Sequence, residues 1–212
     1  MPNRYLDILQ QYWGYEGFRP LQEDIVKSAG EGNDTLALMP TGGGKSITFQ
    51  VPALAREGLC LVITPLIALM KDQVSTLKRN GIKADAIHSG LTYREIKVVF
   101  DNAMFGGTKF LYVSPERLST DLFREKITDI QVNLIAVDEA HCISQWGYDF
   151  RPSYLTIADI REYIPHAPIL ALTATATPRV VDDIMERLKF AQPNVFRKSF
   201  VRDNLAYVVR QA

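Results

Sequence analysis

The sequence predicts an α/β domain in three layers, with helices on both faces of a mostly parallel β-sheet. Apolar runs of four to six residues recur along the chain, with helical patterns between them. Several runs are apolar throughout, which is typical of strands buried on both faces of a parallel sheet. With 212 residues and a hydrophobic share of 47%, the chain is long and apolar enough for one large domain with a sizeable core.

The predicted strands and helices alternate along the chain. Six apolar runs predict strands: TLALM at 35–39, LCLVIT at 59–64, ADAIH at 84–88, KFLYVS at 109–114, LIAVD at 134–138 and ILALT at 169–173. Helical patterns predict helices at 4–13, 21–29, 45–56, 66–80, 93–105, 154–163 and 178–188. Pro178 would open the last of these helices, where its missing N–H costs nothing. This alternation predicts βαβ units, whose ligands bind at the carboxyl ends of the strands.

The composition of the chain argues against several functional classes. The 24 basic and 24 acidic residues cancel, which argues against binding to nucleic acid by bulk charge, although a local basic track stays open. Cys60 is expected to be a buried strand thiol, and it forms no CxxC pair with Cys142, so neither zinc nor a disulfide framework is expected. A reducing cytoplasmic compartment fits this cysteine usage. No signal peptide is expected, and no apolar run approaches the roughly 20 residues of a membrane span.

A glycine-rich segment at 39–46, MPTGGGKS, lies between a predicted strand and a predicted helix. Its glycines allow a tight turn with inward-pointing N–H groups, and the helix N-terminus adds partial positive charge for a phosphate. Lys45 is expected to contact the β- and γ-phosphates of ATP, and Ser46 to ligate Mg²⁺. A plain glycine-rich turn is the alternative, and Met39 departs from the first glycine of the phosphate-loop pattern. The predicted nucleotide-binding residues here are Thr41, Gly42, Gly43, Gly44, Lys45 and Ser46.

Two carboxylates follow the apolar strand at 134–138, in the segment LIAVDEAH. At a strand tip beside the phosphate loop, Asp138 is placed to hold Mg²⁺ and Glu139 to orient the attacking water as a general base. A solvated turn after a buried strand is the alternative, which the upstream phosphate loop disfavours. Zinc at His141 is not expected, because no His or Cys partners converge at ligand spacing. The predicted catalytic residues are Lys45, Asp138 and Glu139.

The phosphate loop and the acidic segment together resemble the paired nucleotide motifs of superfamily-two helicases, and further segments resemble the RecQ family of DNA helicases. These segments, in the family order, are GYEGFRPLQ at 14–22, VITPLIALMKDQ at 62–73, YVSPERL at 112–118, CISQWGYDFRP at 142–152 and LTATA at 172–176. They are long and cover nearly the whole chain, so the resemblance is specific. It implies a RecA-like fold and a motor driven on DNA by ATP and Mg²⁺.

The resemblance assigns adenine recognition to the segment at 14–22. Gln22 carries both a donor and an acceptor, so it can bond the edge of a purine in two places. Tyr15 or Arg19 can stack on the purine ring. An ordinary core aromatic is the alternative for Tyr15.

The resemblance also assigns DNA contacts and coupling to later segments. Thr64, Ser114 and Thr173 lie at the ends of predicted β-strands and could contact DNA phosphates. Such contacts position a DNA strand without reading its base sequence. Bases of any sequence could stack on the aromatic-rich segment at 142–152. Because this segment follows the acidic pair, its movement could reposition Glu139. For Trp146, the alternative is a hydrophobic plug in the domain core. The predicted DNA-binding or coupling residues are Thr64, Ser114, His141, Gln145, Trp146, Phe150, Arg151, Thr173 and Thr175.

The resemblance extends to the organisation of the chain. Residues 1–195 are expected to form the ATP-binding lobe, with a helical adenine-recognition segment at 1–30, and residues 196–212 to begin a linker to a second lobe. The expected partners are ATP and single-stranded or partly duplex DNA, the expected polarity is 3′-to-5′, and a nearly inactive monomeric lobe is expected. Two alternatives stay open: a regulatory module that binds nucleotide and DNA without turnover, and a phosphate-loop small-molecule kinase.

Overall fold

The computed structural model describes residues 3–197, and its centre is a seven-stranded sheet. The strands are β1 (Thr35–Leu38), β2 (Leu59–Ile63), β3 (Ala84–Ile87), β4 (Phe110–Val113), β5 (Val132–Val137), β6 (Ile169–Thr173) and β7 (Asn194–Arg197). Their order across the sheet is β3-β4-β2-β5-β6-β1-β7, and every neighbouring pair is parallel. The predicted parallel sheet is confirmed.

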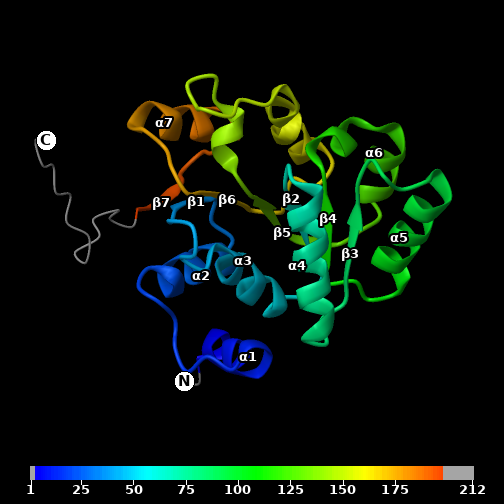
Figure 1. Cartoon of the computed structure of the whole chain (residues 1–212), viewed down its shortest axis with the longest axis horizontal. Helices are drawn as coiled ribbons and strands as arrows, with labels where there is room; N and C mark the ends of the chain where they lie inside the picture. Colours follow the sequence, from blue (N-terminus) through cyan, green and yellow to red (C-terminus); the bar gives the residue numbers. More distant parts are fainter. Residues whose placement is uncertain (1–2, 198–212) are drawn as a thin grey trace, which may run out of the picture.

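Helices cover both faces of the sheet. They are α1 (Arg4–Trp13), α2 (Gln22–Gly30), α3 (Lys45–Leu54), α4 (Ile67–Arg79), α5 (Tyr93–Phe105), α6 (Asp121–Ile127) and α7 (Pro178–Arg187), with 3₁₀ helices η1 (Pro115–Ser119), η2 (Ala140–Ile143) and η3 (Pro152–Glu162). Figure 1 shows α2 and α3 on one side of the sheet and α7 on the other. The three layers predicted from the alternating pattern are therefore present.

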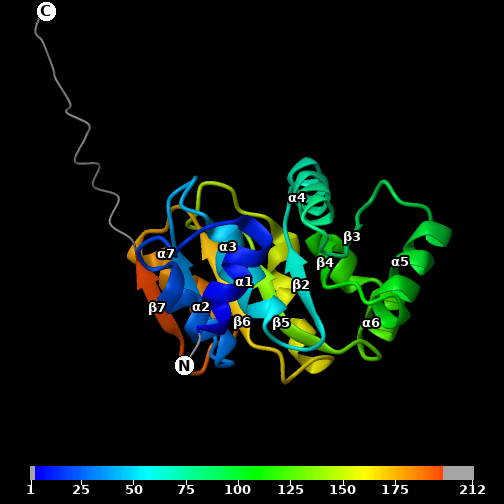
Figure 2. The same cartoon turned by 90° about the horizontal axis from the view of Figure 1, so that it is seen from below.

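The strand side chains alternate between two apolar cores, because successive residues of a strand point to opposite faces. In β1, Leu36 and Leu38 join the core under α5, α6, η3 and α7, whereas Ala37 joins the core under α2, α3 and α4. Burial on both faces is the reason that several of these strands are apolar throughout. α1 lies outside this arrangement and packs on α2 and α3, where Leu9 and Val26 share a small third core (Figure 2).

Some elements differ from those predicted. β7 pairs with β1, so the predicted lobe boundary after residue 195 falls inside a strand, while residues 198–212 of the predicted linker lie outside the described residues. β7 lies at the sheet edge and is mostly exposed, so it lacks the apolar run by which the other strands were predicted. The predicted helix at 154–163 is the 3₁₀ helix η3, and α6 was not predicted. Within residues 3–197, no helix combines the length and apolarity of a membrane span.

Candidate nucleotide-binding and DNA-coupling site

The carboxyl ends of five neighbouring strands bring the predicted motifs together. Across the order β4-β2-β5-β6-β1, these ends carry Ser114, Thr64, Asp138, Thr173 and the phosphate loop. Backbone hydrogen bonds continue the sheet into the site, since the N–H of Asp138 donates to the Ile63 carbonyl at 2.9 Å. The order of the sheet, which differs from the order of the chain, thus places Asp138 between Thr64 and the phosphate loop.

The phosphate loop lies between β1 and α3, where the sequence predicts it. Gly42 and Gly44 have φ angles of 76° and 78°, in the left-handed region that favours glycine. A Cβ on Gly43 would lie 2.8 Å from the Pro40 carbonyl oxygen, so this position also excludes a side chain. Met39, the departure from the motif, is fully buried in the core and lies before the turn. The backbone therefore has the shape of a phosphate cradle with a helix N-terminus behind it.

Arg19 and Gln22 contact the phosphate loop itself. The guanidinium of Arg19 donates to the Gly42 carbonyl at 2.7 Å, and Gln22 Nε2 donates to the carbonyls of the next two glycines at 3.3 and 3.1 Å. Gln22 Oε1 accepts from the backbone N–H of Arg19 at 2.8 Å. Adenine recognition by Gln22 stays a prediction, and it requires these bonds to rearrange. Tyr15 is 51% exposed, so it is free to stack and the alternative of a core aromatic is wrong.

Asp138 is a buried carboxylate at the tip of β5. Burial and the adjacent Glu139 raise its pKa to about 6, while the N–H of Glu139 and the charge of Lys45 oppose this rise. That N–H donates to Asp138 Oδ1 at 3.0 Å. Tyr154 of η3 donates its hydroxyl to the Asp138 carbonyl at 2.9 Å, a contact with no local signal in the sequence because the two residues are 16 positions apart. A carboxylate buried in this way gains from a nearby cation.

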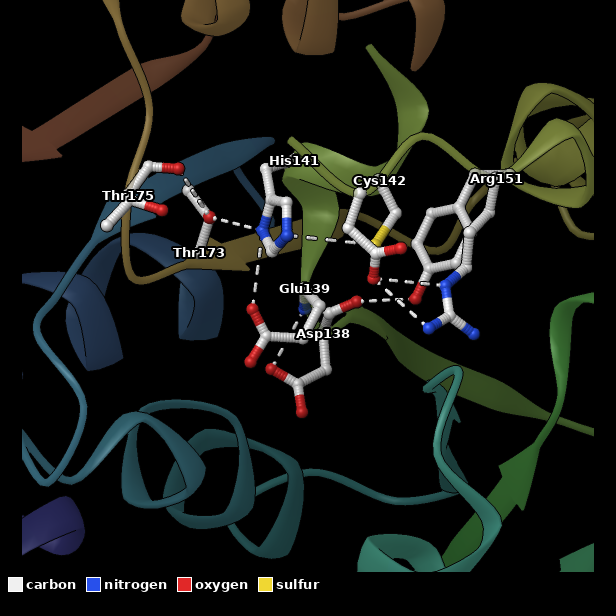
Figure 3. Close-up of polar contacts among 9 residues, drawn as sticks. Asp138, Glu139, His141, Cys142, Arg151, Thr173 and Thr175 are labelled. Atoms are coloured by element: carbon white, nitrogen blue, oxygen red, sulfur yellow. Dashed lines mark hydrogen bonds and ion pairs between the residues drawn. The ribbon is translucent and has the colours of Figure 1, made fainter. Parts of the chain in front are cut away.

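Glu139, His141 and Thr173 form a polar chain across the ends of β5 and β6 (Figure 3). His141 Nδ1 lies 3.3 Å from Glu139 Oε2 and 3.0 Å from Thr173 Oγ1. The Thr173 hydroxyl donates its own hydrogen to the Thr175 carbonyl at 3.1 Å. In the bond between His141 and Thr173, Nδ1 of His141 is therefore the donor and the hydroxyl oxygen is the acceptor. Burial lowers the pKa of His141, which favours the neutral ring. Three of the predicted coupling residues are thereby brought into one network with Glu139.

Two hydroxyls that were predicted to meet DNA phosphates are buried. Thr64 and Thr173 are both 0% exposed, so their contact with DNA phosphates stays a prediction, and it requires their side chains to become accessible. Thr173 is bonded to His141, and the backbone N–H of Thr64 already donates to the Val113 carbonyl at 3.2 Å. These strand ends carry polar side chains because they face the site. The neighbouring strands of the sheet nevertheless bury those side chains. The DNA contact of Ser114, which is 6% exposed, stays a prediction.

The aromatic segment at 142–152 includes a surface loop between η2 and η3, residues 144–151, which we call the aromatic loop. Trp146 is 59% exposed and Tyr148 is 79% exposed, so the alternative of a core plug is wrong for Trp146. Gln145 is exposed and Phe150 is half-buried. The Tyr148 ring stacks on the His141 ring, with centroids 4.7 Å apart and planes at 20°. The loop therefore touches the polar chain through the stack of Tyr148 on His141.

His141, Cys142 and Asp149 converge beside this loop, contrary to the expectation that no partners approach His141. Their ligand atoms all lie within 4.8 Å of one another. However, the Arg151 guanidinium donates to Asp149 at 3.1 Å, and burial raises the pKa of the Cys142 thiol to about 12. Metals bind the thiolate, so a protonated thiol and a paired carboxylate argue against a metal site here. The same ion pair engages Arg151, one of the predicted DNA-binding residues.

Residues 19–184 match the DEAD/DEAH box helicase family, a span that includes the phosphate loop, the acidic segment and the aromatic loop. The chain belongs to this family. The helicase domain is 48% identical over 204 residues to the ATP-dependent DNA helicase RecQ of Pasteurella multocida, covering 96% of the chain and 32% of that protein. It is 46% identical over 211 residues to the RecQ of Bacillus subtilis, covering 99% of the chain and 36% of that protein. The chain thus spans about a third of the length of these relatives.

Solved helicase structures share the fold of this helicase domain. The Pyrococcus furiosus Hef helicase domain is 22% identical and matches with a TM-score of 0.62, covering 84% of this chain and 38% of that chain. The DUF1998 helicase MrfA is 16% identical and matches with a TM-score of 0.70, covering 93% of this chain and 33% of that chain. At these identities the likeness concerns the fold alone, and it confirms the RecA-like architecture.

Proposed function

We propose that this chain is the ATP-binding lobe of a RecQ-type DNA helicase, which hydrolyses ATP to move along single-stranded DNA and to unwind duplexes. The observation that carries the proposal is the arrangement of one site: the phosphate loop and the acidic pair occupy nearby strand ends, and an exposed aromatic loop touches the same pair through His141. The RecQ relatives support DNA as the substrate. The 3′-to-5′ direction rests on the resemblance of the sequence motifs.

Mg²⁺-ATP is proposed to bind with its phosphates in the phosphate loop, near Lys45, and with the metal on Ser46 and Asp138. Asp138 fits this role because its carboxylate is buried with a raised pKa, and within residues 3–197 only its Oδ1 has a hydrogen-bond partner. Its Oδ2 is thus available to a cation. When bound, Mg²⁺ supplies charge neutralisation at the β- and γ-phosphates.

Glu139 is proposed as the general base that orients the attacking water. Its carboxylate lies against His141, and His141 stacks on Tyr148 of the exposed loop. A DNA base that moves Tyr148 therefore acts on Glu139 through one intervening ring. This short path is a physical means by which DNA can stimulate ATP hydrolysis, and it gives the aromatic loop a role that a small-molecule kinase would not need.

The substitution Glu139→Gln tests the proposal in the helicase that contains both lobes. The amide keeps the shape of the side chain and loses the base, so we expect ATP binding to persist and DNA-stimulated turnover to fall by about 10²–10⁴-fold. Nucleotide titration and steady-state ATPase assays with an oligonucleotide measure the two effects. Glu186→Gln, an exposed position on α7, is the matched control.

Turnover by the Glu139→Gln enzyme at the parent rate would remove Glu139 from the assigned role. A parent enzyme that binds ATP and DNA but hydrolyses nothing would instead support the regulatory module without turnover. The kinase alternative has lost its support, since the chain belongs to a helicase family.

A further inference from the structure

Arg179 and Trp146 stack on each other at the protein surface. Arg179 is the second residue of α7, and its guanidinium carbon lies 3.4 Å from the centroid of the Trp146 ring. The two residues come from segments far apart in the sequence. Trp146 remains 59% exposed although the guanidinium covers part of it, so much of the ring stays open to a ligand. Arg179 is itself exposed, and the contact is not part of either core.

Trp146, one member of the stacked pair, lines an apolar cavity. The cavity has a volume of about 440 Å³ and lies between the aromatic loop and the start of α7. Its walls can contact a flat ring from several sides. Its lining includes His141, Trp146, Tyr148, Thr175, Thr177 and Val180.

The charge of Arg179 does not stabilise the helix to which it belongs, α7. A cation in the first turn opposes the helix dipole, and the first turn of α7 contains no acidic residue to compensate it. In the part of the chain that the structure describes, no salt bridge includes Arg179. Its one recorded partner is the indole of Trp146. Its charge is therefore left free for an anion next to the ring.

We propose that Arg179 is a positioning residue for single-stranded DNA, holding the indole of Trp146 so that a nucleobase stacks on its open face at the cavity. A cation over an aromatic ring favours one ring orientation, and an oriented aromatic platform binds bases of any sequence. The unpaired guanidinium also attracts the phosphate that accompanies the base. This inference rests on the proposed function, because it names a residue that prepares the proposed DNA contact.

The same arrangement relates DNA binding to hydrolysis. The cavity is lined by Tyr148 and His141 as well as by Trp146, and His141 contacts Glu139. A base held by Trp146 therefore lies in the same cavity as His141, the residue that contacts Glu139. Arg179 acts on this path through Trp146 and does not touch the reacting atoms.

Tryptophan fluorescence of the chain carrying Trp13→Phe tests the proposal, because the chain contains two tryptophans and this change leaves Trp146 as the single reporter. Thymidine oligonucleotides should quench the Trp146 emission. In the Arg179→Ala variant we expect the concentration for half-maximal quenching to rise about tenfold. Arg179→Lys keeps the charge and loses the planar stack, so it should also bind more weakly. Arg187→Ala removes another exposed arginine of α7, which pairs with Asp183, and should bind as the parent does.

A second measurement reports on the ring without DNA. Acrylamide should quench Trp146 more readily in Arg179→Ala than in the parent or in Arg187→Ala, since one side of the ring loses its cover. Equal oligonucleotide affinities of the parent and Arg179→Ala would overturn the positioning role and leave the proposed function intact. Parent-like affinity of Arg179→Lys would also overturn it, because charge alone would then suffice. Absence of any quenching by oligonucleotides in the parent would overturn the inference together with the proposed DNA binding.

Discussion

Asp138 lies where its own charge is unfavourable in the absence of a cation. Burial and Glu139 raise its pKa from 3.8 to about 6, so the folded state favours the protonated carboxyl more than the unfolded state does. The stability gained from protonation is complete below the ordinary carboxyl pKa and is lost as the pH rises through the folded pKa. At neutral pH the metal-free protein therefore carries a charged, poorly solvated group. Such a cost is common at functional sites, where stability and activity oppose each other.

We predict that Asp138→Asn stabilises the metal-free chain. The neutral amide removes the buried charge, so the free energy of unfolding should rise by about 1–3 kcal/mol at pH 8 and the gain should vanish near pH 4. Urea denaturation in the presence of EDTA at both pH values measures this. Asp129→Asn, at an exposed position, serves as the control. A variant less stable than the parent at pH 8 would show that hydrogen bonding to Asp138 outweighs its desolvation.

Lys45 is the full positive charge of the phosphate loop, and it acts on Asp138 across the site. We predict that Lys45→Ala weakens ATP binding by about 1.5–3 kcal/mol, at least roughly tenfold in Kd, because a hydrogen bond to a charged group is lost. Calorimetric titration of ATP into the folded variants is the measurement. Lys78→Ala, which removes an exposed lysine paired with Asp85, should leave the Kd as it is. Equal affinities of parent and Lys45→Ala would exclude the phosphate contact.

At the scale of elements, the aromatic loop contacts two neighbouring elements by ring stacking. Tyr148 stacks on His141, which belongs to η2, and Trp146 stacks on Arg179, which belongs to α7. These two stacks hold the loop while Trp146 and Tyr148 stay exposed. An element held in this way can change its packing when a base binds without disturbing either core.

We predict that Trp146→Ala uncouples DNA from ATP hydrolysis in the helicase with both lobes. Loss of the stacking platform should raise the concentration of single-stranded DNA needed for half-maximal stimulation by about tenfold or more. ATPase rates over a series of oligonucleotide concentrations give this value. Phe150→Ala should act in the same direction, with an added loss of stability because Phe150 is half-buried. Half-maximal stimulation of the folded Trp146→Ala variant at the parent's oligonucleotide concentration would contradict the stacking role.

At the scale of the whole molecule, one RecA-like domain presents a site that is open on one side. The relatives that this chain resembles are about three times its length. By resemblance, a second lobe is expected to close over the nucleotide with an arginine, and such a finger contributes roughly 10³–10⁵ in rate in related phosphate-loop enzymes. Arg151 and Arg179 cannot replace it from across a cleft, since one is paired with Asp149 and the other stacks on Trp146.

We predict that the 212-residue chain alone binds nucleotide weakly, hydrolyses ATP at no useful rate and does not unwind DNA. Unwinding needs two lobes that grip a strand and change their separation, a closure that one lobe cannot perform. Steady-state ATPase assays with and without single-stranded DNA, beside a strand-separation assay, test this against a two-lobe enzyme. Robust DNA-stimulated turnover by the isolated monomer would mean that this lobe supplies the missing charge itself.

The amino-acid sequence by itself determined the parallel sheet, the phosphate loop and the acidic pair. Each of these follows from residues adjacent in the chain: apolar runs for the buried strands, glycines for the turn before α3, and two carboxylates directly after β5. Local backbone preference and burial are sufficient to specify them, so their spacing in the sequence is informative. Edge strand β7 was missed for the same reason, because its exposed residues carry no apolar run.

The tertiary structure alone decided which side chains meet. The contact of Gln22 with the phosphate-loop carbonyls, the burial of Thr64 and Thr173, and the stack of Arg179 on Trp146 all join distant segments or depend on neighbouring strands. A motif records a residue type and its spacing, whereas the accessibility and partner of a side chain depend on sheet order and packing. The physical reason is that hydrogen bonds and stacking act over a few ångströms in space, whatever the separation along the chain.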